Sequence, residues 1–423
     1  MLDKKLFIIL FFLAPIFGFS QITFDDSDYD LDTNKIVFGI RSEAFNNSNA
    51  LNASVLNSAL FGGYISREDR AHMASKLRAT NNTGSYLNNS IFYSQRVDSL
   101  FGSEVSKLSF HINLADRNEN LSMFSENAAL LSFYGNKQYA GKSVRLTPFD
   151  FNQIHYSQFQ LGISKEFKSG NKFQVGVSFL YGQNNRRSEV ERLNLIVSEY
   201  GDLIGTDAEL SIFETERNNT GFLKYNGAGI SMDMSGIFNL QLLSDSTHPA
   251  KFHVSIQDFG FIQWHASSTE ISADTFYTYD GVHFQNIFDP NAINTGGNQI
   301  EIIDSISTTE RKSFTTFVPS TIKFYLRQDF NQWTFTIGGM QRINAFYYPF
   351  FYGKAGYHLN SSWLLSGQMN YGGYGGLGGG LEIQYITPKY NIKLGSTNIE
   401  GFIAPTKIAG QSIYFLLSYK ISS

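Results

Sequence analysis

Strict alternation of apolar and polar side chains is the feature that most constrains the fold of this chain. In stretches of about ten residues, every second side chain is apolar, and polar or glycine-rich turns separate the stretches. We count roughly fourteen such stretches, which indicates an all-β, antiparallel fold. The clearest of them lie at residues 173–181, 252–256, 322–326, 333–337 and 413–421.

The alternation alone leaves two architectures open. A soluble β-sandwich or propeller buries its apolar face against protein, whereas an outer-membrane barrel turns that face to lipid and has a polar interior. A cluster of aromatic residues at 347–352, typical of an interfacial girdle, and a final strand that runs nearly to the C-terminus favour the barrel. No repeat of 40 to 50 residues supports a propeller. We therefore predict an antiparallel transmembrane β-barrel of about fourteen strands, with one or two short helices as plug or periplasmic elements.

The first twenty residues have the features of a cleaved secretory signal, which also favours the barrel. Lys4 and Lys5 form a basic start, residues 6–17 are apolar, and Gly18-Phe19-Ser20 is a small-x-small cleavage site. The apolar run is shorter than the ~20 residues of a spanning helix. We therefore predict export to the bacterial outer membrane. The predicted parts are a signal peptide at 1–20 and the barrel domain at 21–423, with 21–85 as an N-terminal plug or periplasmic region.

Composition excludes several classes of function. The chain has no cysteine, so it can form no disulfide, thiolate zinc site, iron–sulfur cluster or cysteine nucleophile. Cleavage after residue 20 removes Lys4, Lys5 and Asp3 and takes the net charge from −4 to −5. Nucleic-acid binders carry a basic face, so an acidic chain argues against a nucleic-acid partner.

Two segments predict short helices, and a third predicts a tight turn. Residues 66–77 open with a serine N-cap and acids in the first turn, and residues 125–135 begin with a serine and end on glycine. Residues 371–380 contain the spacing G-x-G-x-x-G, but a strand-like run follows instead of a helix. We interpret this stretch as a glycine-rich hairpin with aromatic rings packed over bare backbone.

The stretch 25–32 is strongly acidic. Asp28, Asp30 and Asp32 have the spacing that opens a calcium loop. The pattern then fails, because a threonine stands where the loop needs its turn glycine and a glycine replaces the bidentate glutamate. We interpret the stretch as a solvated acidic tail.

The sequence shows no constellation for catalysis or metal binding. No two of the eight histidines stand four residues apart, and neither H-E-x-x-H nor G-x-S-x-G occurs. His155 and His253, on predicted strands, are the histidines that merit examination, and we assign neither a role. We predict no catalytic, cofactor-binding or metal-ligating residue, no cofactor and no enzymatic activity. Acid pairs lie near arginines that can neutralise them: Glu189 and Glu191, Glu214 and Glu216, with Arg186, Arg187, Arg192 and Arg217.

Parts of the chain also resemble a known family. Residues 154–165 are similar to a recurring early strand of that family, and residues 395–407 with 414–419 are similar to its closing motif. The family is a set of outer-membrane barrels of Bacteroidota that share a domain of unknown function. In outline it is similar to the fourteen-stranded FadL-type transporters and to PorV of the type IX secretion system. The resemblance covers most of residues 85–423 and implies a barrel without implying a mechanism.

Three functional hypotheses follow. The first is passage of a hydrophobic or small ligand across the outer membrane, through a lumen lined by Lys323, Tyr325, Arg327 and Asp329. The alternative is a non-enzymatic structural or assembly subunit that anchors a secretion, gliding or surface-lipoprotein complex. A third, an integral-membrane enzyme, needs a clustered site that the sequence does not show. A continuous interior opening would separate the first from the second. The predicted partners are outer-membrane lipid, a hydrophobic small ligand and an outer-membrane protein, and no nucleic acid.

Overall fold

The computed structural model of the chain describes residues 36–421, except 101–102, 217, 220, 222–223, 243–248 and 280–306. The predicted signal peptide and the acidic stretch at 25–32 lie outside the described residues, as does Arg217. Among the described residues, no helix has the length and apolarity that crossing a membrane requires.

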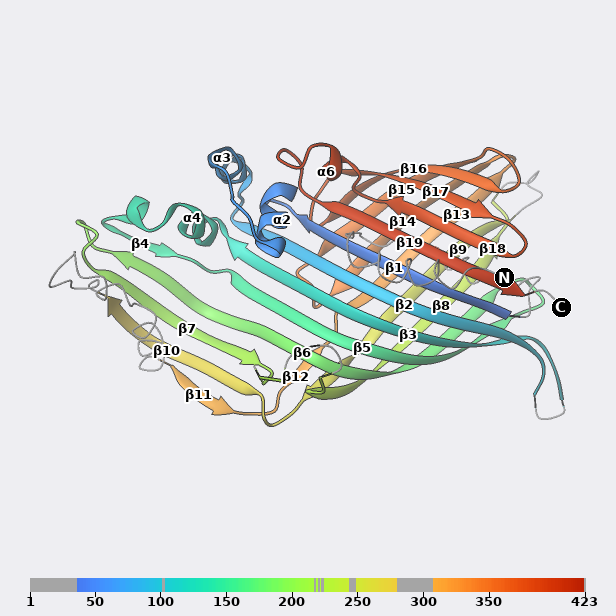
Figure 1. Cartoon of the computed structure of the whole chain (residues 1–423), viewed down its shortest axis with the longest axis horizontal. Coiled ribbons are helices and arrows are strands. Elements are labelled where there is room, and N and C mark those ends of the chain that lie inside the picture. The colour runs from blue at the N-terminus through green and yellow to red at the C-terminus, as the bar shows by residue number, and fades with distance from the viewer. Residues whose placement is uncertain are drawn as a thin grey trace, which may run out of the picture.

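Fourteen of the described strands close into an antiparallel barrel, which confirms the predicted fold class (Figure 1). The first and last strands close the ring, since Ile36 pairs with Ile421 at one end of their ladder and Asn46 with Gln411 at the other. In ring order the wall strands are β1 (Ile36–Ser48), β2 (Thr80–Leu100), β3 (Ser103–Ser125), β5 (Phe149–Glu166), β6 (Lys172–Val197), β8 (Gly227–Leu240), β9 (Ala250–Trp264), β13 (Ser320–Phe330), β14 (Trp333–Ile343), β15 (Tyr348–His358), β16 (Trp363–Gly373), β17 (Gly378–Ile386), β18 (Tyr390–Ser396) and β19 (Gln411–Ile421).

The same sheet continues beyond the barrel wall. β6 has 26 residues; its first part pairs with β8, and its second part, from Arg186 to Val197, pairs with β7 instead. β4 also pairs with the second part of β6, β10 pairs with β7, and β11 pairs with β10. We call these strands the extension sheet, which reaches to the left in Figure 1. The added strands are β4 (Lys142–Arg145), β7 (Ile204–Glu214), β10 (Thr269–Tyr279) and β11 (Thr308–Arg311), and a short β12 (Thr315–Phe317) pairs with β9.

The two ends of the barrel differ. We call the end where β1 begins and β19 ends the base, and the opposite end the top. Short turns join wall strands at the base, at residues 167–171, 331–332, 359–362 and 387–389. Short turns of outer-membrane barrels face the periplasm, so we expect the base to be the periplasmic side. The top carries the extension sheet, a 3₁₀ turn η2 (Lys137–Tyr139), and the helices α2 (Ala53–Phe61), α3 (Arg67–Lys76), α4 (Glu126–Tyr134) and α6 (Glu400–Ile403) (Figure 1).

Both predicted helices are present with the predicted caps. The Ser66 hydroxyl accepts the backbone N–H of Asp69 at the start of α3, and the Ser125 hydroxyl accepts that of Ala128 at the start of α4. Both belong to connections at the top, between strand ends that point away from the base. Within the region 21–85, residues 36–48 and 80–85 are part of the barrel wall.

The wall has an apolar outer face and a polar inner face. On β6 the side chains of Phe173 and Phe179 are exposed, whereas Ser178 and Leu180 are buried. On β13 the same alternation exposes Phe324 and buries Lys323 and Tyr325, which therefore point into the barrel, as expected for a lumen lining. An apolar band on the outside with polar groups inside is the arrangement of a barrel that spans a membrane. The protein is an outer-membrane-type β-barrel.

The glycine-rich stretch 371–380 is a hairpin, as predicted. β16 ends at Gly373 and β17 begins at Gly378, and the backbones of Gly372 and Gly376 exchange hydrogen bonds of 3.0 and 3.1 Å. Tyr374 at the turn is fully buried and donates its hydroxyl to the backbone carbonyl of Ala345. Its ring lies directly over the bare backbone of Gly84 on β2, where an added Cβ would overlap the ring.

Gly84→Ala is expected to lower the free energy of unfolding by about 1–3 kcal/mol, because the new methyl group must displace the buried Tyr374 ring. Gly353 on β15 provides a matched control, since a Cβ built there meets nothing within 4 Å. Gly353→Ala should change the free energy of unfolding by less than about 0.5 kcal/mol. Urea unfolding in lipid vesicles, followed by tryptophan fluorescence, measures both. Equal effects of the two changes would contradict the close approach of Tyr374 to Gly84.

Candidate functional site: a polar network across the lumen

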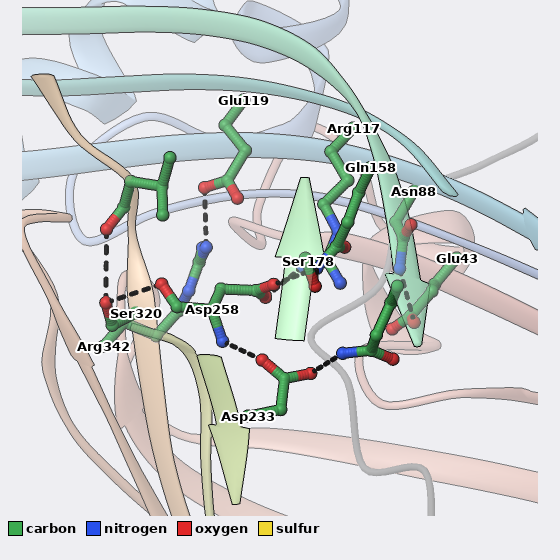
Figure 2. Close-up of polar contacts among 12 residues, drawn as sticks. Glu43, Asn88, Arg117, Glu119, Gln158, Ser178, Asp233, Asp258, Ser320 and Arg342 are labelled. Carbon is green, nitrogen blue, oxygen red and sulfur yellow. Dashed lines mark hydrogen bonds and ion pairs between the residues drawn. The ribbon is translucent and has the colours of Figure 1, made fainter. Parts of the chain in front are cut away.

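Charged side chains from opposite walls meet inside the barrel (Figure 2). Arg117 and Glu119 both point inward from β3 and are buried. Arg117 forms an ion pair with Asp258 of β9, and Glu119 accepts a 2.6 Å hydrogen bond from Nη2 of Arg342 on β14. Five wall strands separate β3 from β14 around the ring: β5, β6, β8, β9 and β13. The pair of Glu119 and Arg342 therefore joins walls that face each other across the lumen.

A bulge in β9 aims Asp258 into the lumen. Its φ is 58°, and the pairing of β9 with β8 shifts at this point. Bulges re-aim side chains, and aspartate is among the residues that tolerate a positive φ. The backbone N–H of Asp258 donates to Oδ1 of Asp233 at 2.7 Å, and its carbonyl accepts the hydroxyl of Ser320 at 3.0 Å. These bonds hold the bulge in the position from which Asp258 meets Arg117.

Two glutamines of β5 complete the centre of the network. Gln158 donates through Nε2 to Asp258 Oδ1 at 3.1 Å and to the Ser178 hydroxyl at 2.8 Å. Gln160 donates to Asp233 Oδ2 at 2.5 Å. Both buried carboxylates therefore receive hydrogen bonds from β5, which is adjacent to neither β8 nor β9 in the wall, and buried charges require such partners.

Glu43 extends the network to β1, the strand that pairs with β19 to close the barrel. Asn88 of β2 donates to Glu43 Oε1 at 3.2 Å, and Arg41 Nε lies 3.7 Å from the same oxygen. The charges on the described inner wall at this level balance, which keeps the net charge of the buried network near zero. The acids are Glu43, Glu119, Asp233 and Asp258, and the bases are Arg41, Arg117, Lys323 and Arg342.

Water hardly reaches this level of the lumen. The exposed fraction of the side chain is 11% for Arg117, 4% for Asp258, 7% for Arg342 and 1% for Glu119. A side chain beside a water-filled passage would be open to a probe of the size of water. These four side chains therefore leave little room for water around them at this height of the lumen.

Aromatic side chains pack next to the network on the side of the top. Phe45 of β1 lies 5.7 Å from the ring of Tyr86 and 5.8 Å from that of Tyr374, measured between ring centroids. The guanidinium of Arg342 lies 5.3 Å from the centre of the Tyr86 ring, a cation–π contact that ties this cluster to the ion pairs. A second buried cluster surrounds Trp264 on the wall below the extension sheet. Apolar packing thus reinforces the polar seal.

A smaller charged group lies on the wall between β15 and β19. Lys354 Nζ is 2.6 Å from Glu382 Oε1, and the Tyr414 hydroxyl donates to Glu382 Oε2 at 2.7 Å. All three side chains point inward. This group ties three wall strands to one another, whereas the main network crosses the lumen.

The structure places His155 and His253 on opposite faces of the wall. His155 points outward, with Nε2 3.1 Å from both carboxylate oxygens of Asp116, and Ser157 donates to the same carboxylate at 3.1 Å. Serine and histidine thus share an acid instead of contacting each other, which is not the arrangement of a Ser–His–Asp triad. His253 points inward, is fully buried, and stacks on Tyr325 with ring centroids 4.6 Å apart.

The sequence analysis missed His111 and the residues of the network. The imidazole of His111 lies between two hydroxyls, with Nδ1 2.6 Å from Ser94 and Nε2 2.7 Å from Ser164, so both ring nitrogens are occupied. No group of three or more His, Asp or Glu side chains within the described part of the chain could hold a metal ion. Only one feature of the sequence could have indicated the network. It is a charged residue at a position where the alternation predicts an inward-facing side chain.

The acid pairs of β6 and β7 are neutralised by arginine. Arg192 contacts Asp207 at 2.9 Å, Glu209 at 2.7 Å and Asp274 at 3.0 Å on the extension sheet. Hydrogen bonds from Asn194 and Arg192 hold the pKa of Asp207 below its ordinary value. These residues form a solvated charge ladder above the membrane. The other pairs are Arg186 with Glu214 and Arg187 with Glu189.

Asp69 joins the helices α2 and α3 at the top. It accepts hydrogen bonds from the hydroxyl of Ser66 at 2.7 Å, from Nδ2 of Asn52 at 3.0 Å and from the hydroxyl of Ser54 at 3.4 Å. Burial by itself raises the pKa of Asp69, but these hydrogen bonds to the charged form outweigh it and leave the pKa below its ordinary value. The ionised carboxylate therefore stabilises the contact between the two helices.

Acidification is expected to loosen α2 and α3. Because the pKa of Asp69 is lowered in the folded state, its stabilising contribution is complete above the unfolded pKa of about 3.9. That contribution is lost as the pH falls through the folded pKa. A fluorophore on Ser75→Cys, the single cysteine of that variant, should show lower anisotropy below about pH 4. Asp69→Asn should lower the anisotropy already at pH 7, whereas Asp274→Asn, on the extension sheet, should leave it unchanged. A pH response retained in Asp69→Asn would assign the transition to another group.

The chain is similar to solved outer-membrane proteins. They include the P. putida toluene transporter TodX, at 9% identity and a TM-score of 0.43 over 94% of this chain and 92% of that one. A Pseudomonas aeruginosa FadL homologue has 8% identity and a TM-score of 0.41 over 92% and 90%. The translocator domain of the autotransporter NalP from Neisseria meningitidis has 8% identity and a TM-score of 0.34 over 92% and 89%.

Sequence comparison assigns the chain to a family. None of the curated proteins matches it in sequence. One family model matches residues 34–396, which is most of the chain, and confirms the predicted resemblance to barrels with a domain of unknown function. The protein belongs to the family of unknown function DUF5723.

Proposed function

We propose that this protein is a non-conducting outer-membrane barrel that anchors a partner protein at the cell surface. The observation that carries the proposal is the buried polar network inside the barrel, in which ion pairs from β3 reach both β9 and β14; we take this network to close the lumen. A transporter needs a path through its interior, whereas an anchor needs only a stable wall and a docking surface. The sealed interior therefore supports the anchoring subunit over the passage of a hydrophobic small ligand.

Apolar side chains at the top support a protein partner. Leu60 and Phe61 of α2, Tyr64 beyond it, and Phe402 and Ile403 of α6 are all exposed. The two helical segments are adjacent, since the backbone N–H groups of residues 53 and 54 donate to carbonyls of residues 408 and 405. Neighbouring exposed apolar side chains on a water-facing end are typical of an interaction site. We call these five residues the top patch.

Gentle purification of the native protein from outer membranes, followed by mass spectrometry of everything retained, tests the proposal. A partner protein in stoichiometric amount is expected, and it should be lost from the variant Phe61→Ser/Ile403→Ser. Leu359→Ser is the control, because Leu359 is also well exposed but lies in a turn at the base. Retention of a hydrophobic small molecule without any protein would contradict anchoring and support passage.

A further inference from the structure

The short helices at the top form one continuous surface with β4 (Figure 1). α3 joins the others: Nη1 of Arg70 donates to a backbone carbonyl in the last turn of α4 at 3.4 Å, and Nε2 of His72 lies 3.1 Å from the carbonyl oxygen of Lys407, beyond α6. Asn127 of α4 donates to the carbonyl of Arg145 on β4 at 3.1 Å, and α2 is tied to α3 through the contacts of the buried aspartate described above. We call this surface the helical cap: residues 53–78, 126–145 and 400–407.

The exposed charges of the helical cap are mostly positive. Its exposed acids are Glu68 and Glu126, whereas Asp69 is buried and Glu400 accepts the backbone N–H of Gly379 at 3.2 Å. None of its exposed bases forms an ion pair within the part of the chain that the structure describes. This excess of positive charge stands out in a chain whose net charge is −4. Seven basic side chains of the cap are exposed: Arg67, Lys76, Arg78, Lys137, Lys142, Arg145 and Lys407.

The top patch belongs to the same surface, because its five apolar residues lie on α2, just beyond α2 and on α6. Two of the bases flank it in the chain: Arg67 follows Tyr64 by three positions, and Lys407 follows Ile403 by four. An apolar centre with a polar rim is the usual composition of a protein interface, and the charges on the two sides of an interface are complementary. A protein that covers the top patch therefore meets positive charge around it.

Lipid headgroups lie too low to neutralise this charge on the side of β3. The exposed apolar side chains of β3 end at Leu114, after Phe110 and Ile112, and the outward side chains of 116–122 are polar. The cap begins at Glu126, twelve residues beyond Leu114, which is roughly 40 Å along an extended strand. The cap therefore stands above the edge of the apolar band, where a protein can reach it.

We propose that the helical cap binds an acidic protein surface, which the partner anchored at the top supplies. The inference rests on the proposed function and adds the chemistry of the partner to it. Charges that water can reach are screened by salt, so the contact should weaken as the salt concentration rises. Binding of anionic lipid in place of an acidic protein is the competing outcome of the test.

Fluorescein-labelled poly-L-glutamate is the probe, and its anisotropy is measured with the purified full-length protein in detergent at low salt. The variant Lys137→Glu/Lys407→Glu reverses two exposed charges of the cap outside the top patch, in η2 and beyond α6. It should raise the Kd of the probe at least about tenfold, as should a rise in salt to about 1 M. Gel mobility before and after heating shows that each variant is a folded barrel.

The control reverses two exposed lysines in turns at the base. Lys168→Glu/Lys389→Glu makes the same change of net charge far from the helical cap, so the Kd of the probe should stay within about twofold of the wild-type value. Equal Kd values for the cap variant and the control would overturn the proposal. Loss of bound anionic lipid from the cap variant, measured by mass spectrometry, with an unchanged Kd for poly-L-glutamate would assign the cap to lipid and overturn it as well.

This test and the test of anchoring can fail separately, because poly-L-glutamate binding requires no native partner. A native partner that is lost from Phe61→Ser/Ile403→Ser but retained in full by Lys137→Glu/Lys407→Glu would overturn the acidic contact and leave the anchoring function intact. If no native partner were retained while the cap variant lost the probe as expected, the result would contradict anchoring and support an acidic ligand of the cap.

Discussion

Arg342→Ala is expected to lower the free energy of unfolding by about 3–5 kcal/mol, the usual cost of removing one partner of a buried ion pair. Its guanidinium donates to Glu119 at 2.6 Å, and the exposed fraction of the Glu119 side chain is 1%. Without Arg342 the carboxylate of Glu119 remains in the lumen without its ion-pair partner. The ring of Tyr86 loses a cation–π contact in the same variant. Both losses lower the free energy of unfolding.

Removing both charges together distinguishes the effect of the ion pair on stability from the effect of lost packing. Glu119→Gln/Arg342→Met keeps most of the volume and removes both charges of this pair, so it should recover at least half of the loss. Arg192→Ala, on the solvated face of the extension sheet, should leave stability unchanged within error. Urea unfolding in lipid vesicles, followed by tryptophan fluorescence and gel mobility, measures all three. If the double variant were as unstable as Arg342→Ala, the ion pair would not be the cause.

The barrel wall was predictable because lipid and lumen impose opposite polarity on alternate residues. The alternation at 173–181, 322–326 and 413–421 marks β6, β13 and β19 correctly, and the predicted number of wall strands is confirmed. The extension sheet was not predicted. Its strands extend beyond the lipid-facing part of the wall, so apolar and polar residues alternate less regularly in them. All four residues of β11, for example, are exposed.

The end of the barrel that holds the helices was harder to predict than the helices themselves. An N-cap such as Ser66 or Ser125 is a local signal, and it correctly marked where α3 and α4 begin. Whether a connection lies at the top or the base depends on the direction of every strand before it. The sequence analysis assigned no strand to residues 36–48, so it could not determine the end of the barrel at which the helices lie.

The sealing network could not be predicted from the sequence because its partners are far apart in the chain. Arg117 and Asp258 are separated by 141 positions, and Glu119 and Arg342 by 223. Alternation identifies an inward residue but does not reveal which strand faces it across the ring. The predicted lumen lining therefore stayed on one strand, at Lys323, Tyr325, Arg327 and Asp329.

Removing the sealing side chains is expected to open the barrel to ions. The quadruple variant Arg117→Ala/Glu119→Ala/Asp258→Ala/Arg342→Ala removes both ion pairs and leaves none of the four charges without its partner. It vacates the level of the lumen where side chains from β3, β9 and β14 now meet. Ion flux through planar bilayers that contain the variant should rise at least about tenfold above the wild-type background, since a water-filled passage replaces a filled one.

The wild-type protein should show no conductance steps in the same bilayers. Arg192→Ala/Asp207→Ala is the matched control, because it removes an ion pair of the extension sheet, outside the lumen. Its conductance should equal the wild-type background. Conductance steps in the wild-type protein would show that the network does not close the lumen and would favour passage of a ligand. A quadruple variant that is folded but silent would instead place the seal in the aromatic cluster around Tyr86 and Tyr374, which packs against Arg342 on the side of the top.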